Sequence, residues 1–464
     1  MQLSLDGEKQ FAKLFMELAR AYKLWVDDHK AYFQEMEKDN LIAITINAPH
    51  NMQEEMSGKY KRQEPCIYQL HHTSCSLSIM RKLAILIRRS SNLNCLPYEL
   101  HPVIEAIVYE YVNVELDSFI DCVVKNGEHC NIKLDVLKKI ATDRVRIFKK
   151  EFSSSVYQFP VTMFNLSGEL KLSDSIRLLP VDTMDLAEEE LALYKDTRTF
   201  DYNYYLEVHV KTRCSKQLAL QQAEKARDAT YNILKLLATR LSPRAIPLLT
   251  SKDRITHPFD FYRHGKDENN INNTINYNFP VFQFDSREFW LVFHQSKNVD
   301  SSLIGIVFKI VELLLLPNFS SQRVVERLER SLLWYGDAVT ESSFYQQVQK
   351  LVSSMEALVN FHDDDTTETF KRRVTHLNIT HVGLDDEITN KAKQLYDARS
   401  KIVHGSSVDE RFDFCIISFC SETLLRAIYY FSLFGFEKTG FNKTLPKFLD
   451  ELPKRAVLRC DEKL

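Results

Sequence analysis

Hydrophobic residues recur at helical spacing in the first third of the chain. From Gly7 to Asn40, apolar side chains three or four positions apart fall on one face, which predicts one long amphipathic helix. A short apolar run at residues 41–46 predicts a strand. The same helical spacing predicts three more helices, over residues 76–89, 97–124 and 132–152. We therefore expect a helical N-terminal region, residues 1–152.

The pattern changes after Ser153. Runs of β-branched and aromatic residues with partial alternation predict strands over residues 156–164, 202–210 and 281–293. A helix is predicted over residues 215–241, and the asparagine-rich segment 266–278 is expected to be a loop or an ordered excursion. We expect a mixed α/β middle domain, residues 153–299.

From Ser301 onward the pattern is almost purely helical. The predicted helices span about 301–316, 319–335, 341–361, 366–378, 386–404 and 409–434. Short connections between them imply antiparallel neighbours, so residues 300–464 are expected to form a compact helical bundle. The predicted fold class is therefore mostly α, and α+β overall.

Composition narrows the class of protein. The 464 residues carry a net charge of -3, and no predicted domain is basic overall, so any nucleic-acid site must be a local patch or cleft. Glycine is scarce and forms no phosphate-binding loop, which argues against a nucleotide-hydrolysing or dinucleotide-binding enzyme. The longest apolar run contains Lys309 and Glu312, so we expect no membrane span. Nine cysteines without framework spacing, and no signal peptide, predict a cytoplasmic protein with reduced thiols.

The segment from Leu395 to Gly405 carries the clearest chemical pattern. It places Arg399 and His404 five residues apart at the end of a predicted helix, followed by a helix-stopping glycine. Arginine binds phosphate oxygens in a bidentate manner, and histidine transfers protons near neutral pH. RNA supplies its own nucleophile, the 2′-OH, so this pair suffices to cleave RNA without a metal or another cofactor.

This segment resembles the HEPN superfamily, and within it the Apea-like branch. Arg399 and His404 fit the R-x4-6-H signature, and their flanking residues fit the LY..RS..VHG pattern of that branch. Upstream, Met355–Leu358 fits the "EAL" helix of the family, and Glu326–Arg330 with Trp334-Tyr335 also fits the branch. The resemblance covers roughly residues 300–435, about a third of the chain.

The resemblance implies a metal-independent endoribonuclease that acts as a homodimer or higher homo-oligomer. Relatives often serve as toxins or antiphage effectors that cut tRNA or other RNA, which makes a phage-derived trigger a candidate partner. By position, Arg399 and His404 become the catalytic pair, and Glu356 becomes the carboxylate that orients the arginine. Ser400 occupies the polar position after the arginine, where many relatives carry Asn, Asp or His.

Helix geometry limits how the motif can work. Positions five apart lie about 140° apart around an ideal helix, so Arg399 and His404 cannot share one narrow face. Either the helix loosens before Gly405, or the site combines residues from two protomers across a two-fold axis. The second arrangement would require a dimer.

Several basic residues are candidates for RNA binding. Lys371, Arg372 and Arg373 lie in the helix before the motif helix, and Lys401 lies within the motif. Three further basic stretches, at residues 59–62, 81–89 and 132–152, could also contact phosphates, although each alone is more typical of a solvated surface.

Two other patterns could bind metal, and each has a simpler explanation. Cys66, His71, His72 and Cys75 have ligand atoms for zinc, but their spacing matches no standard finger and favours packed cysteines and surface histidines. The acidic run 362–365 after a predicted helix is typical of a solvated loop. We therefore predict no metal site.

A second functional hypothesis is open at this stage. Ser400 departs from the residues usual at its position, and the chain lacks a basic domain. Both features also suit a HEPN module without activity that serves as a dimerisation or RNA-binding scaffold.

Overall fold

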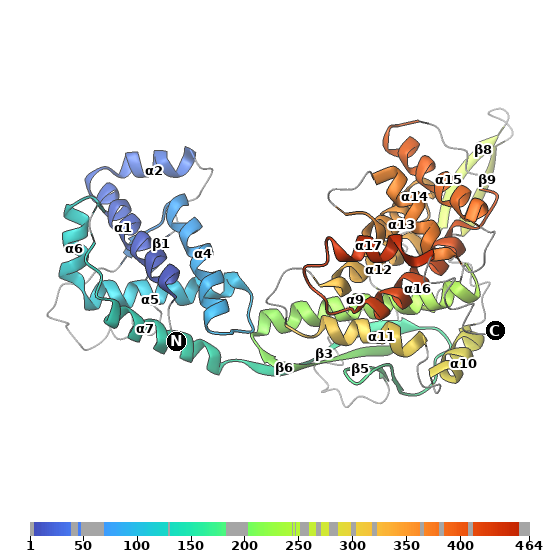
Figure 1. The fold of residues 1–464 in the computed structure, drawn as a ribbon, viewed down its shortest axis with the longest axis horizontal. Coiled ribbons are helices and arrows are strands. Elements are labelled where there is room, and N and C mark those ends of the chain that lie inside the picture. The colour runs from blue at the N-terminus through green and yellow to red at the C-terminus, as the bar shows by residue number, and fades with distance from the viewer. Residues whose placement is uncertain are drawn as a thin grey trace. The chain divides into compact units, whose positions relative to one another are not determined.

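A computed structural model describes most of the chain and divides it into two compact units. Unit 1 comprises residues 1–155 and 212–221, and unit 2 comprises residues 156–211 and 222–464. The structure describes residues 4–38, 45–47, 69–128, 130–181, 203–243, 245, 247–250, 259–265, 271–277, 286–297, 303–317, 323–361, 366–379, 385–406 and 412–453. These residues are mostly helical with some β structure (Figure 1), which confirms the predicted fold class.

Unit 1 is a helical unit with one short two-stranded ladder. Its helices are α1 (Leu5–Asp27), α2 (His29–Lys38), α4 (Ser74–Ser90), α5 (His101–Val114), α6 (Leu116–Val124) and α7 (Leu134–Lys150). The ladder pairs β1 (Thr45–Asn47) with β2 (Gln69–His71). Apolar faces of α1, α4, α5 and α7 form one continuous core, in which Phe11, Leu83 and Ile104 are fully buried. The predicted helices 76–89 and 132–152 are confirmed as α4 and α7.

Two breaks divide helices that the apolar pattern predicts as continuous. The single helix expected over 7–40 is wrong, because the chain turns at Asp28. The Asp28 carboxylate accepts hydrogen bonds from the backbone of Lys30 and Ala31, both at 3.0 Å, and so caps the start of α2. Likewise, the helix expected over 97–124 consists of the 3₁₀ turn η1 (Pro97–Leu100), α5 and α6, with the α5–α6 break at Glu115.

A five-stranded antiparallel sheet with the order β4-β5-β6-β3-β7 lies mostly in unit 2, whereas residues 153–155 of β3 and 212–214 of β6 belong to unit 1. The strands are β3 (Ser153–Met163), β4 (Leu170–Lys171), β5 (Ile176–Pro180), β6 (Tyr204–Cys214) and β7 (Leu248–Leu249). The predicted strands 156–164 and 202–210 are confirmed as β3 and β6, apart from residue 202, which lies outside the described residues. The predicted helix 215–241 is confirmed as α9 (Lys216–Leu241).

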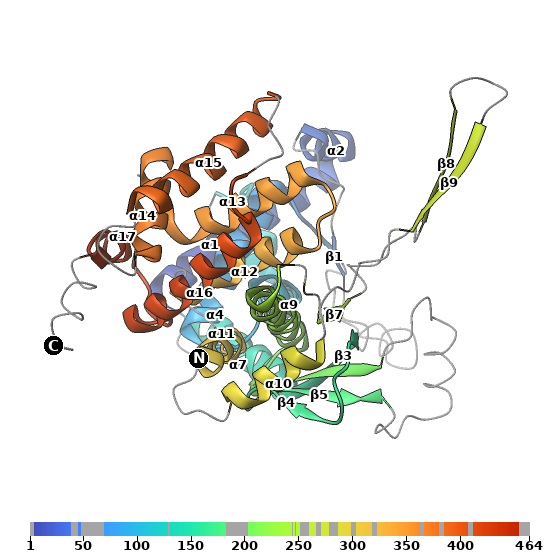
Figure 2. The same cartoon turned by 90° about the vertical axis from the view of Figure 1, so that its right-hand side faces the viewer.

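Two further segments of unit 2 bear on the predictions. Residues 271–277, inside the segment expected to be a loop or an ordered excursion, form β9 (Ile271–Tyr277), which pairs with β8 (Phe259–Gly265) as a long hairpin (Figure 2). Strands predicted over 281–293 are wrong for the described part, because residues 286–297 form α10 (Ser286–Lys297). Phe289, Trp290 and Phe293 are all buried and fall on one side of this helix.

The helical bundle of unit 2 follows the prediction closely. Its helices are α11 (Leu303–Leu314), α12 (Val324–Val339), α13 (Phe344–Val359), α14 (Thr366–Asn378), α15 (Asp385–Val403) and α16 (Ile416–Phe434). A further helix, α17 (Thr444–Asp450), has no counterpart in the prediction. Helices α13, α14 and α15 pack against one another (Figure 2), and this packing holds the Arg399 segment against the bundle.

Helix α12 approaches α9 closely within unit 2. A Cβ atom at Gly336 would overlap the side chain of Asn232, so only glycine permits this approach. One residue earlier, the buried Tyr335 hydroxyl forms a 2.6 Å hydrogen bond with Thr239 of α9. These contacts fix α9 against the bundle.

The apolar content of the helices also bears on membranes. Within the described part of the chain, no helix combines the length and hydrophobicity that a membrane crossing requires.

Candidate active site

The last turn of α15 presents the predicted motif on regular helical backbone. The His404 amide donates to the Ser400 carbonyl at 3.1 Å, so the segment between the two motif residues is still α-helical. Gly405 then adopts φ +73°, and the Ser406 amide donates back to the Lys401 carbonyl at 2.8 Å. This is a glycine C-cap, and it fixes where the helix stops.

Of the two arrangements considered for the motif, this backbone excludes loosening within one protomer. Because the helix is intact from Arg399 to His404, the two side chains leave it about 140° apart. The arrangement that combines residues of two protomers is the one this backbone leaves, and it stays a prediction.

Arg399 lies beside Glu356, the residue to which the resemblance assigns the orienting carboxylate. Its Nη2 atom is 3.7 Å from Oε2 of Glu356, which is contributed by α13. The arginine side chain is 30% exposed and the glutamate side chain 21%, so the pair lies at the edge of the core. Burial raises the pKa of the Glu356 carboxyl, and the Arg399 cation opposes that rise. The arginine Nε is buried without a hydrogen-bond partner among the described residues.

The other motif residues differ in their exposure. His404 and Lys401 are exposed, whereas Ser400 is half-buried. The imidazole of His404 can therefore reach a solvent-borne substrate. Lys401 can add positive charge at the same helix end.

The three basic residues of α14 serve different purposes. Lys371 pairs with Glu368 at 3.1 Å, and Arg372 pairs with Asp450 at 3.2 Å while remaining 48% exposed. Arg373 is only 2% exposed. It donates to the Val359 carbonyl at 2.7 Å and to Asp450 at 3.0 Å.

The environment of Arg373 corrects its predicted role. A guanidinium that is buried and bonded to α13 and α17 has no surface to offer an RNA phosphate, so Arg373 stabilises the fold. Sequence alone gave no reason to separate it from Arg372. Its partner Asp450 belongs to α17, a helix that was not predicted.

Among the described candidate zinc ligands of unit 1, both histidines are buried and Cys75 is exposed, so the expectation of packed cysteines and surface histidines is wrong for these three residues. His71 stacks on Trp25 with ring centroids 4.2 Å apart, and burial lowers the pKa of His71 to about 4. His72 is fully buried, and its Nδ1 lies 2.9 Å from the Ser76 hydroxyl. Cys66, the acidic run 362–365 and the basic stretch 59–62 lie outside the described residues.

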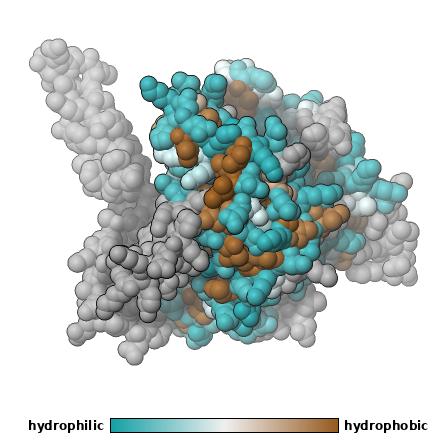
Figure 3. Space-filling model, turned by 90° about the vertical axis from the view of Figure 1, so that its left-hand side faces the viewer, coloured by the Kyte–Doolittle hydropathy of each residue, from teal (hydrophilic) through white to brown (hydrophobic). Residues whose placement is uncertain are grey.

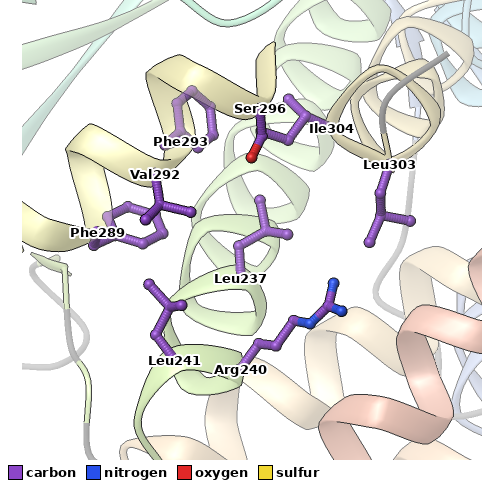
Figure 4. Close-up of a pocket in the computed structure, with 9 residues that line it drawn as sticks. All are labelled: Leu237, Arg240, Leu241, Phe289, Val292, Phe293, Ser296, Leu303 and Ile304. Atoms are coloured by element: carbon purple, nitrogen blue, oxygen red, sulfur yellow. The ribbon is translucent and has the colours of Figure 1, made fainter. Parts of the chain in front are cut away.

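A separate pocket of about 530 Å³ lies in unit 2 between α9, α10 and the start of α11. Figure 4 shows apolar side chains around it, among them Leu237 and Phe293, with the Arg240 guanidinium and the Ser296 hydroxyl at its edge. None of the predicted site residues lines this pocket.

Comparisons with known proteins add no relatives. No protein-family model, no curated protein and no solved structure matches this chain. Any functional assignment therefore rests on the residues and their geometry.

Proposed function

We propose that this chain is a metal-independent endoribonuclease of the HEPN type that works as a homodimer. The observation that carries the proposal is the end of α15, where Arg399 lies beside Glu356 and an exposed His404 precedes a glycine cap. The substrate is RNA, with tRNA as one candidate, and the biological role is that of an antiphage effector. This role rests on the resemblance to the Apea-like branch.

The proposed reaction needs only groups that the chain and RNA supply. The 2′-oxygen of RNA attacks the adjacent phosphorus, and the bond from phosphorus to the 5′-oxygen breaks. His404 accepts the 2′-OH proton while water protonates the departing 5′-oxygen, or water accepts the 2′-OH proton while His404 protonates the 5′-oxygen. Arg399 stabilises the negative charge that grows on the phosphorane oxygens. The products carry a 2′,3′-cyclic phosphate and a 5′-hydroxyl.

The direct test compares His404→Ala and Arg399→Ala with the wild-type protein on total RNA in EDTA. Each substitution is expected to slow cleavage on the order of 100- to 1000-fold. Matched controls are His294→Ala and Arg330→Ala, which remove exposed side chains of the same types elsewhere in unit 2. Cleavage that persists unchanged in either motif variant would disprove the assignment.

The alternative is a HEPN module without activity that serves as a dimerisation or RNA-binding scaffold. Ser400, which replaces the residues more usual at that position, favours it. Sequencing of RNA ends decides between the two, because a scaffold binds RNA without generating 2′,3′-cyclic phosphate ends.

A further inference from the structure

A second pocket, of about 750 Å³, lies entirely within unit 1. It opens where α4 and α7 end, next to the last residues of β6. The residues that line it are Ser91, Asn92, Leu93, Asn94, Thr142, Val145, Arg146, Lys149, Lys150, Phe152 and Arg213. Three cations of the basic stretch 132–152 line the pocket, whereas the helix that carries the stretch 81–89 ends beside it.

The lining of this pocket is strongly cationic. It holds Arg146, Lys149, Lys150 and Arg213, and none of the described residues that line it carries a carboxylate. The one described ion pair among these residues joins Arg146 to Asp143 at 2.8 Å, with both side chains largely exposed. Exposed pairs of this kind contribute little and exchange readily for another anion. In a chain of net charge -3, such a concentration of positive charge is a local feature.

One of the cations is held in place by the fold. Nε and Nη2 of Arg213 donate to the Phe152 carbonyl at 3.0 and 2.9 Å. Asn94 in turn donates to the Arg213 carbonyl at 2.9 Å and accepts from the Ser215 amide. This guanidinium is thus oriented before any ligand arrives, which lowers the entropic cost of binding.

The floor of the pocket is apolar. Leu93, Val145 and Phe152 are each at most 5% exposed and belong to the core of unit 1. An apolar floor beneath a cationic rim suits a nucleotide unit, with the sugar and base over the floor and phosphates on the rim. The volume lies in the range typical of pockets for such units, about 300–1,000 Å³.

We propose that this pocket binds the phosphate backbone of a single-stranded RNA, so that unit 1 captures the strand that the α15 site cleaves. The choice of RNA as the polyanion rests on the proposed function, whereas the cationic pocket does not. Figure 3 shows a face of unit 1 on which hydrophobic residues form narrow bands between hydrophilic ones. A hollow lined by four cations, one of them held in place by the fold, suits a flexible strand better than it suits a flat lipid surface.

The test measures binding of a fluorescently labelled single-stranded RNA by anisotropy. All variants carry His404→Ala, so that the RNA stays intact. The triple variant Arg146→Gln, Lys149→Gln, Lys150→Gln removes three exposed cations from the pocket. The matched control Lys9→Gln, Lys13→Gln, Lys125→Gln removes three exposed cations of unit 1 that do not line it.

The expected result follows from counterion release. Loss of three phosphate contacts makes the negative slope of log K against log salt shallower by about 2 and weakens binding on the order of 100-fold near 0.1 M salt. The control variant should bind like the parent. Arg146→Gln alone should change the slope of log K against log salt by about 0.7. This single variant tests the proposal without placing several substitutions in one helix. Equal affinity of the pocket and control triples would overturn the proposal.

Competition identifies the ligand. An excess of free adenosine monophosphate or triphosphate should leave the RNA bound; displacement at matched phosphate concentration would show that the pocket takes free nucleotides instead. A second outcome would also overturn the proposal that the pocket binds RNA. In it, vesicles of anionic phospholipid bind the parent but not the triple variant, while both proteins bind RNA equally well. Failure of the nuclease proposal would be seen separately: the protein that keeps His404 would bind RNA with full affinity but would not cleave it.

Discussion

A mixing experiment tests whether the α15 site is shared between protomers. Between Arg399 and His404 the intact helix rises about 7.5 Å and turns about 140°. The two side chains of one protomer therefore diverge, whereas a scissile phosphate must touch both groups at hydrogen-bond distance. We expect each site to take its arginine from one protomer and its histidine from the partner.

This arrangement predicts complementation. Arg399→Ala and His404→Ala are each expected to lose activity on the order of 100- to 1000-fold as homodimers. When the two variants are mixed and allowed to exchange, half of the dimers are mixed at random assortment. Each mixed dimer keeps one site with both groups and one site with neither, so activity should return to about a quarter of the wild-type value.

The assay follows cleavage of labelled RNA in EDTA at fixed total protein, before and after subunit exchange. Light scattering establishes that each variant forms dimers. The matched control mixes Arg399→Ala with a double variant, Arg399→Ala and His404→Ala, which cannot restore any site. A mixture of the two single variants that stays as inactive as its parents, despite proven exchange, would refute the shared site.

Three further predictions concern the fold around the site. Arg373→Ala should lower the free energy of unfolding by about 2 kcal/mol because it removes buried hydrogen bonds. Removal of the exposed Arg372 side chain in Arg372→Ala should lower it by under about 1 kcal/mol. Urea denaturation measures both values, and equal losses would contradict the stabilising role of buried Arg373. Burial tends to raise the pKa of Asp450, but the hydrogen bonds and positive charge of Arg373 lower that pKa overall. The stability that the Asp450 carboxylate contributes is therefore present above the ordinary aspartate pKa of about 3.9 and is lost as pH falls through the lowered value. Asp450→Asn should flatten this dependence in urea midpoints recorded from pH 7 to pH 3, and an unaltered curve would exclude the pair as its source. Gly336→Ala should lower the free energy of unfolding by about 1–3 kcal/mol, because its Cβ would overlap Asn232, and an unchanged Tm would show that α12 and α9 can separate without cost.

The sequence predicted best those elements whose apolar spacing is sustained. All the helices expected after Ser301 are present, because each carries a full face of residues that the bundle buries. The break at Asp28 was missed because the apolar pattern runs through it, and only the cap identifies the turn. In α10, aromatic residues suggested strands, although Phe289 and Phe293 are four apart and pack on one helical face.

The candidate site was predictable only in part. The Arg399 to Glu356 proximity follows from the resemblance, and the structure brings these side chains to 3.7 Å. Arg373 is buried and Arg372 is exposed because of which side of α14 faces α13 and α17. The apolar periodicity of the sequence did not predict α17. The role of Arg213 in the pocket of unit 1 was likewise not predictable, because this residue lies on β6 and contacts Phe152, more than sixty residues earlier in the chain.

The presence of residues 212–221 in unit 1 has a consequence for biosynthesis. Because unit 1 includes residues 212–221, it lacks a component of its own structure until the ribosome has passed that point, even though its first 155 residues emerge much earlier. A protein truncated after residue 155 would lack the guanidinium that holds the Phe152 carbonyl. The segment carrying Arg399 and His404 is translated later still, so the chemistry proposed for α15 cannot arise in a nascent chain before unit 1 has all its parts.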